Sequence, residues 1–333
     1  MSVLLSPTDA RALIWNALVG SGTSPRNAEY FTDAILDTEL SGLEGHGFYW
    51  LQYYCAHLLS GKVDGQVVPQ VKPLSDTSFR VDAGCGFAHP AIEAGFKYMI
   101  PAAKTHGIAA MGVYNSYNAA TLGFHTGYLA RAGLLALGAT NAVPNLAPVG
   151  GKRPIIGTNP ISYAVPAPNG EVSFLVDQSA TQVAWTAVKR AAEEGDPIPL
   201  GWALDAEGEP TTDAEAGLAG SMAPAGGVKG FSIGLLVEVL CAALAGGKLG
   251  LDQGSFTEDD GKPINNGQFF VAFDPGKFSG GSFDQTISKL VASITEQEGA
   301  RLPNARREAN KLRLSEQGIP IEPKLYEALK DFA

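Results

Sequence analysis

The segment LEGHGFYWLQYY, residues 43–54, places His46 between two glycines and directly before five aromatic residues in seven positions. Histidine titrates near neutral pH, so it can donate or accept a proton in a reaction. The flanking glycines leave the backbone free to turn and the imidazole ring uncrowded. His46 is therefore either an acid–base group or a histidine that closes a turn above an aromatic core. The segment alone leaves both interpretations open.

A second segment, MAPAGGVKGFSIGLLVEVL, carries Lys229 among Gly226, Gly227 and Gly230 at the start of a long apolar helix. Free amide groups at a helix start attract an anion such as a phosphate or a carboxylate, and the lysine adds a full positive charge. The alternative is a glycine turn into a core helix, with the lysine in solvent. The turn at residues 157–160 in GGKRPIIGTNPIS leads into a strand, and by itself it indicates a structural role.

Composition restricts the class of protein. The chain has 333 residues, of which 45% are hydrophobic and 17% charged, and its net charge is −10. Nucleic acid is a disfavoured partner, because binding a phosphate backbone requires concentrated positive charge. No apolar run reaches the roughly 20 residues that a bilayer requires, and no signal peptide is evident. We expect no membrane association.

Cysteine and histidine usage points to a reducing compartment and to chemistry without a metal. Cys55, Cys85 and Cys241 are odd in number and far apart, so a disulfide framework is not expected and the cytoplasm is the predicted location. No histidine has partners at metal-ligand spacing, and we therefore predict no metal site. A Gly-x-Ser-x-Gly motif is also missing, which disfavours hydrolysis through a covalent intermediate.

The elements that must position these residues are helices at the N-terminus and alternating strands and helices beyond it. Ser-Pro pairs begin predicted helices at residues 6–20 and 24–42, and a third helix follows His46. Strands are expected at 78–84, 108–115, 134–142, 161–167, 172–178 and 268–274. Helices are expected at 90–104, 180–194, 229–245, 283–298, 304–317 and 323–332. Residues 145–160 and 198–227 are predicted to be irregular, ordered and functional loops. The predicted class is α/β, or α+β with a mixed sheet.

The chain resembles the malate/L-lactate dehydrogenase family of the non-Rossmann type, which includes sulfolactate dehydrogenases and the piperideine- and pyrroline-2-carboxylate reductases. The resemblance covers nearly the whole chain. The segments that carry it are SGLEGHG, VDAGCGFAHPAIEAGFKYMIPAAKTHGI, TNAVPNLAPVGGKRPIIGTNPIS, IPLGWALDAEGEPTTD, APAGGVKGFSIGLLVEVLCAALAGG and RLPNARREANKLRLSEQGIPI, in family order. A Gly-x-Gly-x-x-Gly motif after a first strand is missing, so a nucleotide would not bind by the Rossmann device.

The resemblance implies an oxidoreductase that uses NADH or NADPH and works as a homodimer on a small-molecule carboxylate. It implies a family-specific, non-Rossmann NAD(P)-binding mixed sheet domain over residues 116–298. Residues 1–115 would form a helical domain for substrate and dimer contacts, and residues 299–333 would be helices that pack back on it. The positions implied to contact the cofactor are Ala142, Pro144, Thr158, Asn159, Val176, Asp177, Gln178, Ser179, Ala180, Thr181, Lys229, Gly230, Pro303, Asn304 and Arg306.

For catalysis, the resemblance implies that His46 is the proton donor, with Ser116 and Asn118 in the strand-to-helix loop. The family usually has serine before the histidine, where this chain has Gly45. It usually has histidine at position 118, and an asparagine there can donate a hydrogen bond but cannot transfer a proton. Substrate contacts are expected at Trp50, Tyr53 and Tyr117. Trp50 and Ser41 replace arginines that suit a substrate carboxylate, so malate is a poor candidate.

Three functions remain open from the sequence. The first is interconversion of a 2-oxo acid and a 2-hydroxy acid, with His46 as acid and base. The second is reduction of a cyclic imine such as piperideine- or pyrroline-2-carboxylate, because a protonated imine brings its own acidic hydrogen and Tyr49, Trp50 and Tyr53 suit a cationic ring. The third is a nucleotide-binding homologue that has lost catalysis, which the missing arginines and histidine suggest.

Overall fold

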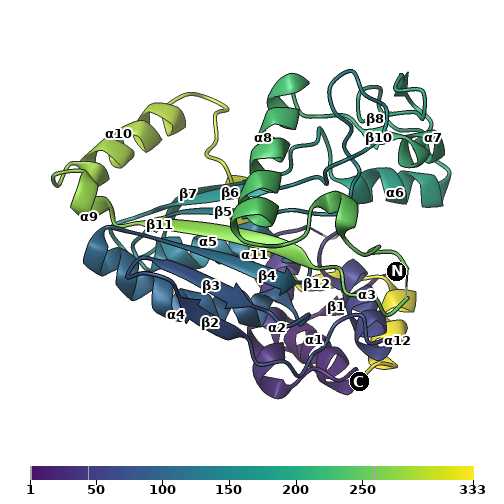
Figure 1. Cartoon of the computed structure of the whole chain (residues 1–333), viewed down its shortest axis with the longest axis horizontal. Helices are drawn as coiled ribbons and strands as arrows, with labels where there is room; N and C mark the ends of the chain where they lie inside the picture. Colours follow the sequence, from purple (N-terminus) through teal and green to yellow (C-terminus); the bar gives the residue numbers. More distant parts are fainter. Residues whose placement is uncertain (1, 44, 259) are drawn as a thin grey trace.

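The computed structural model describes residues 2–43, 45–258 and 260–333 (Figure 1). Its first elements are β1 (Val3–Leu5), α1 (Pro7–Gly20), α2 (Pro25–Leu40) and α3 (Phe48–Leu59). Ser6 accepts a hydrogen bond from the amide of Asp9, and Ser24 accepts one from the amide of Asn27. With proline in the first turn, these caps fix where α1 and α2 begin, as the sequence predicts.

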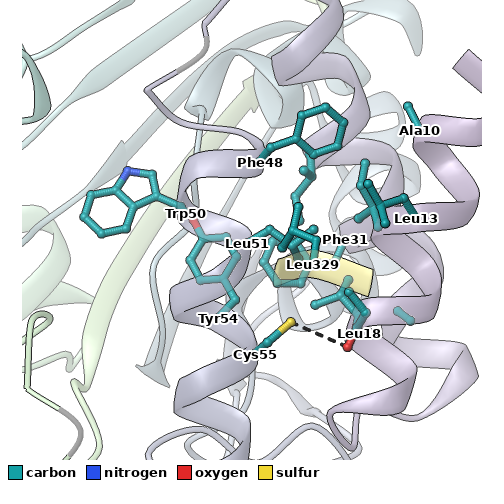
Figure 2. Close-up of a cluster of buried hydrophobic side chains, with 14 of the residues drawn as sticks. Ala10, Leu13, Leu18, Phe31, Phe48, Trp50, Leu51, Tyr54, Cys55 and Leu329 are labelled. Carbon is teal, nitrogen blue, oxygen red and sulfur yellow. Dashed lines mark hydrogen bonds between the residues drawn. The ribbon is translucent and has the colours of Figure 1, made fainter. Parts of the chain in front are cut away.

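The C-terminal segment returns to the N-terminal helices. Its elements are α11 (Ala305–Gln317), β12 (Ile319–Ile321) and α12 (Pro323–Lys330). Strand β12 pairs antiparallel with β1, so the two ends of the chain lie at the same end of the molecule (Figure 1). Side chains from α1, α2, α3 and α12 share one apolar cluster that includes Phe31, Leu51 and Leu329 (Figure 2). We did not predict β1 and β12, because three residues show no periodic pattern.

A seven-stranded mixed sheet lies across the middle of the molecule in the order β2-β3-β4-β11-β5-β6-β7. Its strands are β2 (Gln70–Pro73), β3 (Ser78–Asp82), β4 (Ile108–Ser116), β5 (Leu135–Thr140), β6 (Ile161–Pro166), β7 (Val172–Gln178) and β11 (Asn266–Phe273). Strands β3 and β4 pair in parallel, and the other neighbours pair antiparallel. The predicted α/β class with a mixed sheet is confirmed.

Helices cover the two faces of the sheet unequally. The helices α4 (Ala88–His106) and α5 (Leu122–Arg131) pack against one face, around the buried ring of Phe270. Helix α8 (Val228–Glu238) lies over the opposite face and continues as a π-helical turn, Val239–Leu244 (Figure 1). Short helices α9 (Pro275–Phe278) and η2 (Gly250–Asp252) and the longer α10 (Phe283–Thr295) complete this side. None of the residues of α10 is buried.

A small lobe follows β7. Its elements are α6 (Trp185–Glu194), β8 (Ala203–Leu204), β9 (Pro210–Thr211), α7 (Ala214–Ala219) and β10 (Ser221–Met222), and its three strands form a separate sheet. The prediction that residues 198–227 lack regular structure was therefore wrong, because strands of two residues give no sequence signal. Helix α6 also begins later than predicted, since Ser179 and Thr181 use their hydroxyl groups in turn hydrogen bonds.

The domain boundaries expected from the sequence can be located on this fold. The boundary between residues 115 and 116 falls inside β4, and strands from both sides of it form one sheet. The residues after 299 contact α1, α2 and α3 through α11 and α12. Among the described residues, no helix combines the length and apolar character needed to cross a bilayer.

Candidate active site

His46 lies on a tight turn between α2 and α3. Its amide donates a hydrogen bond of 2.8 Å to the carbonyl of Leu43. The carboxyl group of Glu39, near the end of α2, accepts a hydrogen bond from the amide of Phe48, the first residue of α3. Gly47 has no side chain with which to cap α3, and the glutamate supplies that cap from the neighbouring helix. The turn that carries the imidazole is therefore held from both sides.

The environment of His46 favours the neutral imidazole. Burial lowers the pKa of His46 below its ordinary value, Asp177 raises it, and Arg307 lowers it. Asp177 lies at the end of β7, where its Oδ2 pairs with Arg307 at 3.0 Å and accepts the amide hydrogen of Gly123 at 3.1 Å. The charges of Asp177 and Arg307 therefore have opposite effects on the pKa of His46, and burial determines that this pKa is lowered. At neutral pH this ring is ready to accept a proton.

Asn118 lies in the loop after β4, and its orientation is fixed. Its Oδ1 accepts hydrogen bonds from the amide of Ala120 at 2.6 Å and from the hydroxyl of Tyr54 at 3.4 Å. Both bonds use the oxygen, so the amide NH₂ group is left to donate to another molecule. Ser116, at the end of β4, is buried and its hydroxyl donates weakly to the carbonyl of Tyr117 at 3.5 Å.

The aromatic residues of α3 pack with aromatic residues from two other segments, Tyr117 after β4 and Phe256. Tyr117 is only 1% exposed, and its hydroxyl shares a hydrogen bond with His57 inside the aromatic core. The indole of Trp50 points away from the packed side of α3 (Figure 2). It meets Phe256 edge to face at 4.8 Å and Tyr53 at 4.9 Å, measured between ring centroids. Trp50, Tyr53 and Phe256 therefore form an aromatic wall, and Tyr117 supports it from the buried side through Phe256, at 5.7 Å between ring centroids.

Two loops at the ends of β5 and β6 are joined by a buried network. The amide of Ala142 donates to Oδ1 of Asn159 at 3.1 Å. The Nδ2 of Asn159 donates to the carbonyl of Gly234 at 2.9 Å and to Oε2 of Glu238 at 2.7 Å. Oε1 of Glu238 accepts the amide hydrogen of Gly250 at 2.6 Å. The side chain of Asn159 is thus committed inside the protein, and a ligand here would meet backbone rather than this amide.

The remaining predicted cofactor positions lie on β7 and the adjoining loops. The carbonyl of Val176 accepts a hydrogen bond from a hydroxyl of β6 at 2.8 Å, whereas Gln178 is exposed. The carbonyl of Thr158 accepts the amide hydrogen of Ala180 at 2.8 Å, which joins the loop after residue 157 to the end of β7. Pro144 is half-buried beside the same loops. The loops that follow β5, precede β6 and follow β7 therefore lie next to one another.

The start of α8 packs against these loops. Gly230 is buried so closely that a Cβ there would lie 2.4 Å from the carbonyl oxygen of Ala225 and 2.6 Å from that of Ala180. Only glycine fits, since real side chains do not approach backbone atoms so closely. Lys229 is exposed at the first turn of the same helix. The positive end of the α8 dipole and the ammonium group of Lys229 thus lie beside these loops.

A cavity lies on the other side of Asp177, between α5 and α11. Asn304 adopts a left-handed conformation at the start of α11, and its side chain donates to Glu308 at 2.8 Å. Pro303 and Arg306 are exposed. The charged residues that line the cavity are the cations Arg131, Arg307 and Lys311 and the acids Asp37 and Glu308. Lys311 pairs with both acids, at 2.7 Å and 3.3 Å, and Arg307 pairs with Asp177.

Residues 5–330 match the family model described as malate/L-lactate dehydrogenase. The chain belongs to the malate/L-lactate dehydrogenase family. It is 41% identical over 331 residues to a (2R)-3-sulfolactate dehydrogenase (NADP(+)) of Chromohalobacter salexigens, covering 99% of this chain and 97% of the relative. It is 36% identical to a Delta(1)-pyrroline-2-carboxylate reductase of Burkholderia ambifaria, covering 98% and 96%. The resemblance drawn from the sequence is confirmed.

Solved structures agree with this membership. The delta1-piperideine-2-carboxylate reductase of Pseudomonas syringae pv. tomato superposes with a TM-score of 0.93 at 32% identity over the whole of both chains. A sulfolactate dehydrogenase of Methanocaldococcus jannaschii gives a TM-score of 0.90 at 26% identity, covering 99% of this chain and 96% of that one. This malate/L-lactate dehydrogenase family member is an NAD(P)-dependent oxidoreductase.

The residues of this family member suit a dinucleotide. Gly230 lets the start of α8 pack directly on the backbone of Ala180 and Ala225, and the exposed Lys229 beside it offers charge to a phosphate. The cavity between α5 and α11 adds the exposed cation Arg131.

Two further residues of the site were not predicted. Phe256 joins the aromatic wall from a distant loop, and Glu39 is a buried acid within a helix. Both are ordinary residues in sequence, and only packing brings Phe256 to the aromatic wall and Glu39 to the His46 turn. Arg307, which pairs with Asp177 across 130 positions, ends the turn at residues 303–307 that the family resemblance implies for cofactor contacts.

Proposed function

We propose that this enzyme interconverts a 2-hydroxy acid and a 2-oxo acid, with His46 as the acid–base group. The observation that carries the proposal is the half-buried, neutral imidazole on a fixed turn next to the Asp177–Arg307 pair. The relative named as a sulfolactate dehydrogenase supports a hydroxy-acid substrate.

The proposed chemistry moves a proton at His46. When bound, a nicotinamide cofactor supplies the acceptor or donor of hydride. In the oxidation direction, the neutral imidazole accepts the proton of the substrate hydroxyl. Asp177 favours the imidazolium that results, because it raises the pKa of His46. In the reverse direction the imidazolium returns that proton to the carbonyl oxygen.

Asn118 is proposed to orient the substrate. Its oxygen is occupied by Ala120 and Tyr54, so the NH₂ group can donate to the substrate oxygen as charge develops there. Asn118 cannot replace His46 as a proton donor, since a carboxamide does not titrate. The proposal therefore depends on a single titrating side chain.

The decisive experiment replaces His46 by alanine and measures oxidation of a panel of 2-hydroxy acids and reduction of the matching 2-oxo acids. Turnover should fall by about 10²- to 10⁴-fold while the dissociation constant of the cofactor changes little. His106 is exposed at the end of α4 and provides a matched control, His106→Ala, that should keep normal turnover. Wild-type turnover in His46→Ala would remove this residue from the mechanism.

A second candidate function is reduction of a cyclic imine carboxylate, which the aromatic wall of Trp50, Tyr53 and Phe256 favours. Aromatic faces attract a cationic iminium ring, and such a substrate brings its own proton. The relatives named as pyrroline- and piperideine-2-carboxylate reductases support it. Oxidation of NADPH with pyruvate should be compared with that for Delta(1)-piperideine-2-carboxylate. Faster consumption with the imine, unaffected in His46→Ala, would favour the second candidate.

We propose NADPH rather than NADH as the cofactor. The cavity between α5 and α11 is lined by Arg131, Arg307 and Lys311. Arg307 is paired with Asp177 and Lys311 with Asp37 and Glu308, whereas Arg131 is exposed. An exposed arginine suits a phosphate on the adenosine ribose. The relative from Chromohalobacter salexigens is named as NADP(+)-dependent. Calorimetric titration with each cofactor tests this, and Arg131→Ala should weaken NADPH binding more than NADH binding.

We also propose that the enzyme is a cytoplasmic homodimer. Cys55, Cys85 and Cys241 are free thiols, as a reducing compartment requires. Helix α8 and its π-helical continuation expose apolar side chains and no charged one, apart from Lys229 at the start. Those side chains are Val228, Ile233, Leu235, Leu236, Val239 and Leu244. A helix that is apolar on every side is normally buried, and a second copy of this chain would bury it. Light scattering of wild type and Leu236→Glu should show a dimer and a monomer, respectively.

A further inference from the structure

We infer that Glu39 is the positioning residue that sets the place of His46 in the reaction. Glu39 is 3% exposed, and its carboxyl group lies against the turn that carries the imidazole. Its Oε1 accepts the amide hydrogen of Phe48. A Cβ on Gly47 would lie 2.0 Å from that same oxygen. Glycine at position 47 is therefore required by the carboxyl group, in addition to any freedom that it gives the turn.

The carboxyl group performs a task that the turn cannot perform for itself. Helix α3 begins at Phe48, and Gly47 offers no side chain to its free amides. An acid at this place also meets the positive end of the helix dipole. Glu39 belongs to α2, so its contact joins two helices rather than one local turn. The position of His46 thus depends on where α2 places residue 39.

The same turn of α2 also holds the segment with Asn118. The hydroxyl of Thr38, next to Glu39, lies 3.0 Å from the hydroxyl of Thr121. Thr121 is the residue that precedes α5, three positions after Asn118. Adjacent residues of one helix therefore contact the His46 turn and the Asn118 loop. We assign to this part of α2 the spacing between the two candidate catalytic groups.

The expected cost of losing this contact is kinetic. A displacement of about 1 Å at a reacting group can reduce the rate by about 10²-fold. The inference rests on the proposed function, since it assumes that His46 transfers the proton. The predicted cofactor-binding positions lie on β7, α8, α11 and the loops next to them, including the segment between β5 and β6, and do not include Glu39. Loss of the carboxyl group should therefore lower kcat and leave cofactor binding intact.

The experiment compares Glu39→Ala, Glu39→Gln and Gly47→Ala with wild type. Glu39→Ala removes the carboxyl group that accepts the hydrogen bond of Phe48. Gly47→Ala keeps this carboxyl group but displaces it, because the new Cβ would collide with Oε1. Both should lower kcat by about 10- to 100-fold with the dissociation constant of NADPH unchanged within about twofold. Glu39→Gln keeps a carbonyl oxygen for the amide of Phe48 and should restore kcat to within about threefold of wild type. Thermal melting of each variant reports whether the protein is folded.

The pH dependence of kcat/KM distinguishes a displaced His46 from a general loss of stability, because a loss of stability alone would not change the pKa of His46. Burial lowers the pKa of His46, so a loosened turn should raise the acid limb of kcat/KM for oxidation toward the ordinary histidine value in Glu39→Ala. Asp213 is exposed in the small lobe and caps α7 with its carboxylate, and Asp213→Ala is the matched control that should leave kcat and the profile unchanged.

The outcomes separate this inference from the proposed function. Normal kcat in folded Glu39→Ala and Gly47→Ala, combined with the expected loss in His46→Ala, would overturn the role of Glu39 alone. Normal kcat in His46→Ala would overturn the proposed function itself. If Glu39→Ala does not fold, Gly47→Ala decides, and a folded Gly47→Ala with normal turnover also overturns the inference. Failure of Glu39→Gln to restore kcat would contradict the role of the hydrogen bond.

Discussion

A buried histidine next to the candidate site should make this enzyme sensitive to acid. His125 lies on α5 and is fully buried. Its Nε2 lies 3.2 Å from the carbonyl oxygen of Ala119, and its Nδ1 lies 3.4 Å from the hydroxyl of Tyr30. The carbonyl can only accept, so the proton is on Nε2 and the ring is neutral with both nitrogens in use. Burial lowers the pKa of His125 from 6.5 to about 4.

The magnitude follows from linkage between protonation and folding. The unfolded chain binds a proton at His125 below about pH 6.5, whereas the folded protein resists that proton until about pH 4. Stability is therefore complete above pH 6.5 and is lost progressively as the pH falls through this window. The full difference is about 3 kcal/mol, and at about pH 5 it has reached about 2 kcal/mol. Burial lowers the pKa of His89 as well, which adds loss of the same sign.

The assay is denaturant unfolding at about pH 7.5 and about pH 5, for wild type and His125→Gln. Glutamine can still donate to the carbonyl of Ala119 but does not titrate. The free energy of unfolding should therefore fall by about 2 kcal/mol less in the variant than in wild type over this change of pH. His106→Gln changes an exposed histidine and should behave as wild type. Equal losses in wild type and His125→Gln would refute the reasoning.

Three further outcomes are expected. In Arg307→Gln the pKa of His46 should rise, because this cation lowers it, and the acid limb of kcat/KM for oxidation should move to higher pH; an unchanged limb would contradict the electrostatic assignment. Gly230→Ala should raise the KM for the cofactor at least about 10-fold, since its Cβ would lie 2.4 Å from the carbonyl oxygen of Ala225 and would displace the start of α8 with Lys229; an unchanged KM would mean that the cofactor does not contact this helix start. A thiol reagent at about pH 8 should react slowly with at most one cysteine of the native enzyme, Cys85, because burial raises its pKa and the other two are buried; rapid reaction of all three would show that the core opens.

The parts of the fold that the sequence predicts well are set by neighbouring residues. Ser24 caps α2 within three positions of itself, and the apolar residues of α2 recur at helical spacing, so the start of the helix could be read directly. The glycines around Lys229 marked the beginning of α8 for the same reason. The strands of the small lobe have two residues each, and no periodic signal exists at that length.

In the site too, some features could be predicted from sequence motifs and others depend on tertiary packing. Motifs in family order were enough to indicate the family, a nicotinamide cofactor and His46 as the candidate proton carrier. They could not show that Asn159 points inward to Glu238 or that Tyr117 lies inside the aromatic core. A side chain on a loop or at a strand end can face the core or the solvent, and tertiary packing determines its direction.

The amino-acid sequence by itself determined the helices with local caps, the mixed α/β class and the reaction family, because each depends on residues close together in the chain. Tertiary structure decided the charge state of His46 and the partners that hold it. Asp177 and Arg307 are 130 positions apart and Glu39 belongs to another helix. Burial and ion pairing depend on distances in space, and no local pattern of residues encodes them.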